Sequence, residues 1–139
     1  MEQASRRFTS DLEQLAEIRG FVREQCRALW PEPSATEALA KLELAVSEAA
    51  TNIMLHAYDR EPGRPVDVTV EGNEGQITVT MYHHGYSFDP ESVAPPSFDG
   101  SRQCGFGVFL IRESVDDVAY LQEEKGKSGI RMVKRRSVQ

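Results

Sequence analysis

The sequence has few cysteines, and no apolar run in it is long enough to span a membrane. Among its 139 residues only Cys26 and Cys104 are cysteines. Cysteines this sparse favour free thiols in a reducing compartment over a disulfide framework. No apolar run approaches the ~20 residues of a membrane-spanning helix. Residues 1–7 carry charges without the apolar core of a secretory signal. These absences predict a cytoplasmic protein.

An excess of positive charge is also absent. The chain has 16 Lys and Arg against 22 Asp and Glu, a formal net charge of −6. This balance predicts no direct nucleic-acid partner and no attraction to anionic membranes. The basic residues 134–136 are a local exception that is typical of a solvated tail. With 40% hydrophobic residues, the length suits one globular domain over residues 1–139.

Two helices are predicted before residue 60. Ser10–Glu13 and Ser34–Glu37 each have the pattern of a capping box, a hydroxyl followed three residues later by a carboxylate. Apolar residues at helical spacing follow each box: Leu15, Ile18, Val22, Cys26 and Leu29 after the first, and Leu39, Leu42, Val46, Ala49 and Ile53 after the second. The prolines of residues 30–33 end the first helix, and the second runs towards Tyr58.

After residue 65 the apolar period changes from 3.6 to 2. Residues 66–70 and 77–81 alternate around a glycine-containing turn, which predicts a β-hairpin. Residues 87–104 form a loop of unusual length, Gly105-Phe106-Gly107 opens a helix through Val115, and two strands follow at 118–121 and 130–133. A short strand at residues 7–9 is an option. Helices grouped with an antiparallel sheet predict an α/β (α+β) two-layer sandwich.

The second predicted helix carries the most informative polar residues. Glu48 and Asn52 are four residues apart, so they lie one turn apart on the same face, and His56 continues the row. Leu44 and Leu55 lie close to them, the pattern of a helix that backs a cavity. A carboxylate and a carboxamide at this spacing suit a hydrated Mg²⁺. The carboxylate can instead orient or deprotonate an attacking hydroxyl. The spacing alone favours a plainer alternative, an exposed glutamate and an amide bonded to nearby backbone.

Three motifs, in order along the chain, resemble those of one known family. Residues 48–58, Glu-Ala-Ala-Thr-Asn-Ile-Met-Leu-His-Ala-Tyr, resemble the N-box of the GHKL (histidine-kinase-like) ATPase superfamily. More narrowly, they resemble that of the anti-sigma-factor serine kinases of bacterial partner-switching systems. Phe88-Asp89-Pro90 resembles the end of the family's first glycine box, and Gly105-Phe106-Gly107 resembles the second. The similarity extends in order from Ser10 to Val133.

The resemblance implies a Bergerat-type fold, with helices on one face of a mostly antiparallel sheet, that binds ATP and Mg²⁺. Asn52 would ligate Mg²⁺, and Glu48 would be the general base or would orient the attacking hydroxyl. Gly105, Phe106 and Gly107 would contact the phosphates. This assignment also makes physical sense, because glycines permit close approach and a helix start offers unpaired N–H donors. Residues 87–104 correspond to the family's ATP lid.

The first glycine box departs from the family's pattern. The expected Asp-x-Gly-x-Gly corresponds here to His83-His84-Gly85-Tyr86-Ser87, so His83 and Gly85 would contact adenine, with His83 in place of the aspartate. A carboxylate accepts a hydrogen bond in either orientation, whereas a neutral imidazole offers one acceptor. Losing a charge-assisted bond costs ~1.5–3 kcal/mol, and Ser87 adds a Cβ where a glycine belongs.

Three hypotheses about function stay open at this point, one of them a sensor or scaffold partner whose pocket holds another ligand. In the first, the protein is an ATP-dependent kinase that phosphorylates a serine on an anti-anti-sigma (antagonist) protein. The resemblance also implies a sigma factor as a partner and a homodimer. In the second, the same fold binds a sigma factor or an antagonist without turning over nucleotide, as the His83 and Ser87 departures suggest.

Overall fold

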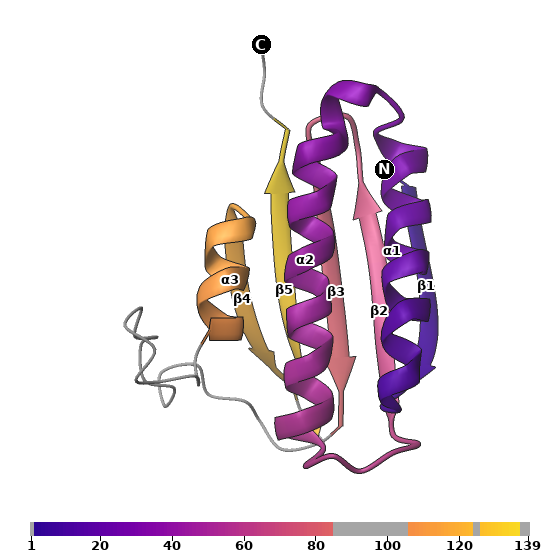
Figure 1. The fold of residues 1–139 in the computed structure, drawn as a ribbon, viewed down its shortest axis with the longest axis vertical. Helices are drawn as coiled ribbons and strands as arrows, with labels where there is room; N and C mark the ends of the chain where they lie inside the picture. Colours follow the sequence, from indigo (N-terminus) through magenta and orange to yellow (C-terminus); the bar gives the residue numbers. More distant parts are fainter. Residues whose placement is uncertain (1, 85–105, 124–125, 137–139) are drawn as a thin grey trace.

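The computed structural model describes residues 2–84, 106–123 and 126–136, which form a five-stranded sheet with helices on one face (Figure 1). The strand order is β1-β2-β3-β5-β4, and every neighbouring pair is antiparallel. The predicted α/β two-layer fold with an antiparallel sheet is confirmed. No helix within the described ranges is long and apolar enough to cross a membrane.

The first two helices are α1 (Leu15–Leu29) and α2 (Thr36–Asn52). Both predicted capping boxes are wrong, because no side chain caps either helix start. Short 3₁₀ turns, Leu12–Gln14 and Pro33–Ala35, lead into the helices instead, and their own backbone hydrogen bonds pair the first N–H groups. Ser10 instead joins the segment before α1 to the loop before β2: its hydroxyl donates to the carbonyl of Glu61 and accepts from the Arg64 N–H.

The predicted hairpin is formed by β2 (Pro65–Gly72) and β3 (Gln76–His83). Alternate residues of β2 are buried, as the period of 2 requires. The optional strand at residues 7–9 is real and longer, since β1 (Glu2–Thr9) pairs with the full length of β2. Its sequence is largely polar, and in its described part only Phe8 is fully buried. Pairing with β2 therefore defines this strand, which its own hydrophobic pattern does not.

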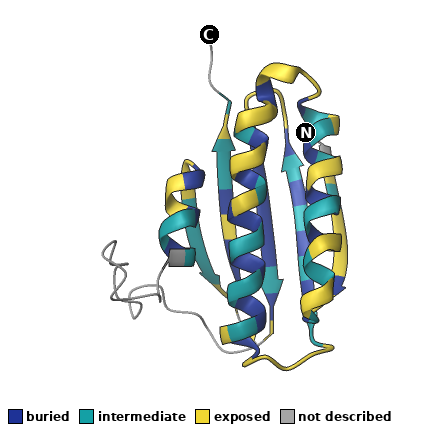
Figure 2. Cartoon of the chain, viewed as in Figure 1, coloured by how far each residue is buried: buried dark blue, intermediate teal, exposed yellow. Residues whose placement is uncertain are grey.

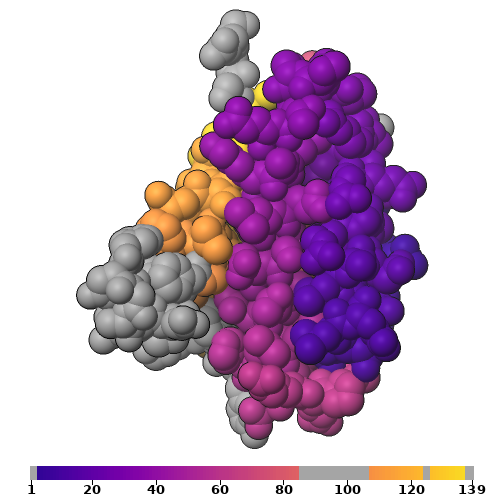
Figure 3. All heavy atoms as spheres, viewed as in Figure 1, coloured from indigo at the N-terminus to yellow at the C-terminus, as the bar shows by residue number. Residues whose placement is uncertain are grey.

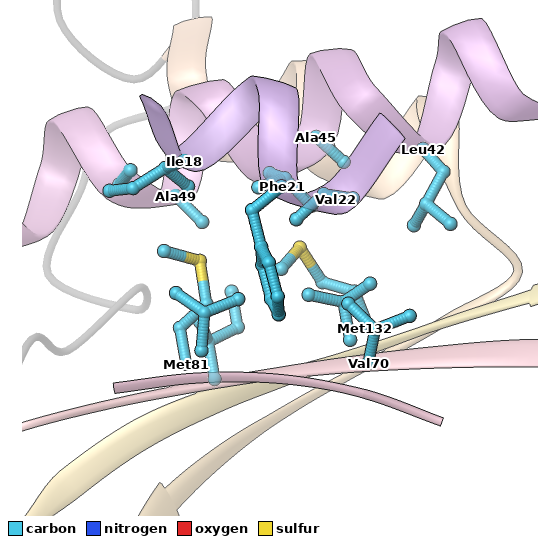
Figure 4. Close-up of a cluster of buried hydrophobic side chains, with 14 of the residues drawn as sticks. Ile18, Phe21, Val22, Leu42, Ala45, Ala49, Val70, Met81 and Met132 are labelled. Atoms are coloured by element: carbon cyan, nitrogen blue, oxygen red, sulfur yellow. The ribbon is translucent and has the colours of Figure 1, made fainter. Parts of the chain in front are cut away.

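The core lies between the sheet and the two long helices. Buried residues lie on the helix sides that face the sheet, and exposed residues lie on the outer sides (Figure 2). In Figure 4, Ile18, Phe21 and Val22 of α1 and Leu42, Ala45 and Ala49 of α2 point towards Val70, Met81 and Met132 of the sheet. Figure 3 shows the side chains of α1 and α2 covering this face of the molecule. The two predicted apolar stripes are thus the contacts that hold the layers together.

The remaining elements are α3 (Phe106–Ser114), β4 (Asp117–Gln122) and β5 (Ser128–Arg135). They match the predicted helix and strands to within a few residues. Strand β5 is inserted between β3 and β4, so the last strand of the chain lies inside the sheet. Helix α3 packs beside α2, and its first turn lies at the same end of the molecule as the end of α2 (Figure 1). The predicted loop 87–104 lies outside the described residues.

Candidate functional site

Glu48 and Asn52 occupy the last two turns of α2, on the side that faces α3. Both side chains are half-buried, so neither is a plain solvent-facing residue. The apolar residues expected beside them behave differently. Leu44 is one of the exposed large hydrophobic residues, at 42%, and Leu55 lines a separate hollow together with Ser10 and Pro62. The pair therefore faces a neighbouring helix, without a flanking leucine wall.

The start of α3 comes unusually close to this pair. A methyl group at Gly107 would lie 3.2 Å from Oε2 of Glu48 and 3.3 Å from Oδ1 of Asn52. These distances are tighter than ordinary van der Waals contact, so a larger residue here would displace the two side chains by a few tenths of an ångström. The first N–H groups of a helix have no partner within it, and the helix dipole is positive there. The structure thus places the helix start close to a carboxylate and a carboxamide, with little space between them.

A π-helical turn, η3 (Ile53–Ala57), directly follows Asn52. At its end the Tyr58 N–H donates to the carbonyl of Ile53 over 2.9 Å. His56 lies in this turn and is exposed, so it does not extend the half-buried row of Glu48 and Asn52. Such turns interrupt a helix and often lie beside functional residues. Here the turn ends α2 and directs Tyr58 into the protein.

Tyr58 ties this turn to the hairpin. Its hydroxyl donates to the carbonyl of Pro65 over 2.6 Å and accepts from the His84 N–H over 2.7 Å. Burial raises the pKa of Tyr58, which keeps the phenol protonated and able to donate. Its ring meets that of His83 edge to face, with centroids 5.9 Å apart. Tyr58 is therefore a positioning residue for the end of β3, a role the N-box spacing alone does not reveal.

His83 is buried in the protein, whereas its neighbour His84 is exposed. Only 3% of His83 is accessible, and its Nδ1 has no hydrogen-bond partner among the described residues. Burial, with a smaller effect from the charge of His84, lowers the pKa of His83 to about 4. The imidazole is therefore neutral at pH 7. A buried polar nitrogen without a partner is unusual, and it is one mark of a site that a ligand completes.

A cavity of about 100 Å³ lies where the end of α2 meets β3, β5 and β4. Its lining includes Asn52 and His83 but not Glu48. The walls are Ala49, Asn52 and Ile53 from α2 and η3, His83 from β3, Tyr120, Leu121 and Gln122 from β4, and Ser128, Gly129 and Ile130 from β5. The lining is mostly apolar, with a few polar groups that converge, as in small-molecule sites.

Tyr120, Gln122 and Ser128 are site residues that sequence reasoning did not identify. Ser128 pairs with His83 on one side and with Gln122 on the other, so these three residues form a row across three strands. The spacing of residues 118–133 in the sequence does not predict this row. It depends on the insertion of β5 between β3 and β4, which becomes visible only in the folded sheet.

Several predicted site residues cannot be placed. Gly85 and Gly105 lie outside the described residues, as do Ser87 and Cys104. Phe106 begins α3, but its side chain is not described. Of the predicted contacts, the structure brings together Glu48, Asn52 and Gly107, and Asn52 and His83 line the same cavity.

Helices on one face of an antiparallel sheet, with a carboxylate and a carboxamide on the helix that borders a cavity, define the architecture of a histidine-kinase-like ATPase domain. A family model described as "Histidine kinase-like ATPase domain" matches residues 8–134 of this chain. The chain therefore belongs to this family, and the resemblance seen in the sequence motifs is confirmed.

The chain is also similar to several relatives that share one name. The chain is 32% identical over 90 residues to the protein named Serine-protein kinase RsbW of Oceanobacillus iheyensis, covering 59% of this chain and 57% of the relative. The protein of the same name from Listeria innocua is 33% identical over 96 residues, covering 63% and 61%. That of Bacillus cereus is 26% identical over 99 residues, covering 65% and 61%. The aligned part thus spans about three fifths of the length of these relatives.

Proposed function

We propose that this protein is an ATP-dependent serine kinase that phosphorylates an anti-anti-sigma-type antagonist protein. We propose further that it binds a sigma factor and so regulates transcription in the cytoplasm, acting as a homodimer. The relatives' shared name is that of a serine-protein kinase. The observation that carries the proposal is the close approach of Gly107 to Glu48 and Asn52, which leaves little room for a side chain at position 107. Few structural roles require a helix start to be packed against two polar side chains at the border of a cavity.

The residues present fit a nucleotide with its magnesium ion. Gly107 leaves a cradle that a Cβ would fill, and the N–H groups at the start of α3 suit phosphate oxygens. The side-chain oxygen of Asn52 is a ligand type that Mg²⁺ accepts. Bound there, Mg²⁺ would neutralise charge on the phosphates. The cavity next to Asn52 would take the base.

In this proposal Glu48 acts on the substrate hydroxyl. Its carboxylate would hold the serine O–H and accept its proton as the hydroxyl oxygen bonds to the γ-phosphorus, while the bond to the β–γ bridging oxygen breaks and ADP leaves. Asn52 and the start of α3 would orient the phosphates. Catalysis would come mainly from positioning and from stabilisation of negative charge.

The alternative is a binding module of the same fold that holds a sigma factor or an antagonist with little or no nucleotide. The neutral, buried His83 supports this alternative, because a neutral group forms weaker hydrogen bonds to a base than a carboxylate does. The unpaired Nδ1 favours nucleotide binding instead, because a buried nitrogen without a partner is costly in a pocket that binds no ligand.

The test combines calorimetric titration with Mg-ATP and transfer of labelled γ-phosphate to a panel of purified anti-anti-sigma-type proteins. We expect the wild type to bind Mg-ATP and to label a serine. Glu48→Gln should retain binding and lose transfer by ~10²–10⁴-fold, whereas Asn52→Ala should lose the magnesium-dependent part of binding. Absence of Mg-ATP binding by the wild type contradicts the kinase proposal. Capture of a sigma factor or an antagonist by the wild type without Mg-ATP binding supports the binding module.

A further inference from the structure

The cavity beside Asn52 contains no charged group among its described lining residues. Its polar side chains are Asn52, His83, Tyr120, Gln122 and Ser128. Carboxamides, hydroxyls and a neutral imidazole can all donate as well as accept hydrogen bonds. A carboxylate, in contrast, only accepts. The described lining thus imposes no fixed direction on a hydrogen bond from a ligand.

The tautomer of His83 is not fixed by a hydrogen bond at Nδ1 within the described residues. The tautomer of a histidine is normally set by the hydrogen bond that one ring nitrogen makes. In this protein Nδ1 is buried and has no partner within the described ranges, and the neighbouring Tyr58 presents a ring edge to the imidazole. The hydroxyl of Tyr58 is already engaged with Pro65 and His84. The imidazole can therefore present either an N–H or a lone pair to a ligand.

The size and position of the cavity suit one end of a nucleotide. At about 100 Å³ it is smaller than the ~300–1,000 Å³ of pockets that hold whole ligands. Asn52 lines this cavity and also lies close to Gly107. If the phosphates bind at the start of α3, the cavity therefore remains available for the base. Ala49, Ile53 and Ile130 provide apolar walls of the kind that a flat heteroaromatic ring requires.

On the basis of the nucleotide binding proposed above, we infer that this cavity accepts both 6-amino and 6-oxo purine nucleotides. A 6-amino purine presents a donor at position 6, and a 6-oxo purine presents an acceptor. A lining that can reverse its hydrogen bonds can match both groups. Where position 6 of the base faces residue 83, an aspartate there would accept from the amino group and would face the oxo group with an unfavourable pair of acceptors.

The experiment is calorimetric titration of the full chain with Mg-ATP, Mg-GTP and Mg-CTP. For the wild type we expect ATP and GTP affinities within about tenfold of each other, with CTP bound at least tenfold more weakly because a single ring leaves the apolar walls exposed. His83→Asp should shift the ratio towards ATP by ~10–100-fold, the size of one charge-assisted hydrogen bond. His84→Asp is the matched control: His84 is exposed, so the same substitution there should leave the ratio unchanged.

His83→Asp buries a carboxylate and can fail to fold, so the wild-type ratio is decisive by itself. A preference for either purine of clearly more than tenfold in the wild type overturns the inference while leaving the proposed kinase intact. Equal shifts from His83→Asp and His84→Asp also overturn it, since a general charge effect would then set the ratio. If the wild type binds none of the three nucleotides, the proposed function fails and the inference falls with it.

Discussion

The core under α1 and α2 and the cavity at the end of α2 both use residues of α2, but they differ in whether their buried polar groups are hydrogen-bonded. In the core region, the indole N–H of Trp30 donates to the carbonyl of Asn73 over 2.8 Å, and the hydroxyl of Ser10 has two partners. In the cavity, Nδ1 of His83 has no partner within the described part of the chain. These polar groups of the first region are paired within the protein, whereas this nitrogen of the second is not.

The difference shows how one helix serves two purposes. Leu42 and Val46 are fully buried between the sheet and α1, and this burial stabilises the fold. Two turns later, Asn52 lies beside this buried stripe and borders a cavity. Filling that space with apolar side chains would raise stability and remove the site, which is the usual opposition between stability and function. The comparison predicts that substitutions in the two regions separate stability from binding.

The largest expected effect lies in the core. Leu42→Ala should lower the free energy of unfolding by about 3 kcal/mol, because it removes a fully buried side chain and leaves a cavity. The affinity of the folded protein for Mg-ATP should not change. Leu44→Ala, on the same helix but 42% exposed, is the matched control and should cost less than about 1 kcal/mol. Urea unfolding measures both variants. Similar losses from the two would mean that α2 is not packed as described.

The next effect is a pH dependence that belongs to the cavity. The unfolded chain protonates His83 below pH 6.5, whereas burial lowers the pKa of the folded imidazole to about 4. Between these values the unfolded state binds more protons, so stability falls as the pH drops from 6.5 to 4. We expect His83 to contribute a loss of about 2 kcal/mol over that window.

Urea unfolding at pH 6.5 and 4.5 isolates this contribution when the wild type is compared with His83→Gln. The variant should show a smaller loss on acidification, since the remaining titrating groups are the same in both proteins. His84→Gln, which changes an exposed histidine, should keep the wild-type loss. An identical pH dependence in wild type and His83→Gln would show that the imidazole is protonated as easily in the folded chain as in the unfolded one.

The smallest effect concerns two glycines in helices. Gly107→Ala should displace Glu48 and Asn52 by a few tenths of an ångström and weaken Mg-ATP binding by about tenfold, or ~1.4 kcal/mol. Its stability should hardly fall, because alanine favours a helix over glycine by ~1 kcal/mol. Gly20→Ala in α1 meets nothing within 4 Å, so it should gain stability and keep full affinity. Full affinity in Gly107→Ala would show that ligand binding does not use the close approach of α3.

Much of the fold could be predicted from local patterns. The two apolar helical stripes, the hairpin and the later helix and strands all appear near their predicted positions, because burial of one face imposes a period on the residues that form it. The capping boxes were wrong because 3₁₀ turns supplied the missing hydrogen bonds. Strand β1 was predicted too short because most of its residues are polar, and its hydrogen bonds to β2 define it.

By itself the sequence determined the family, the helix that carries Glu48 and Asn52, and the substitution of His83 for the expected aspartate. The tertiary structure alone decided that Gly107 approaches that pair closely and that Ser128 lies between His83 and Gln122 in the sheet. It also decided that His83 is buried, with a nitrogen that has no partner in the described part of the chain. The physical reason is the range of the interactions. Helical spacing and residue chemistry act over a few positions, whereas these contacts join strands and helices that are distant in the chain and meet only in the folded sheet.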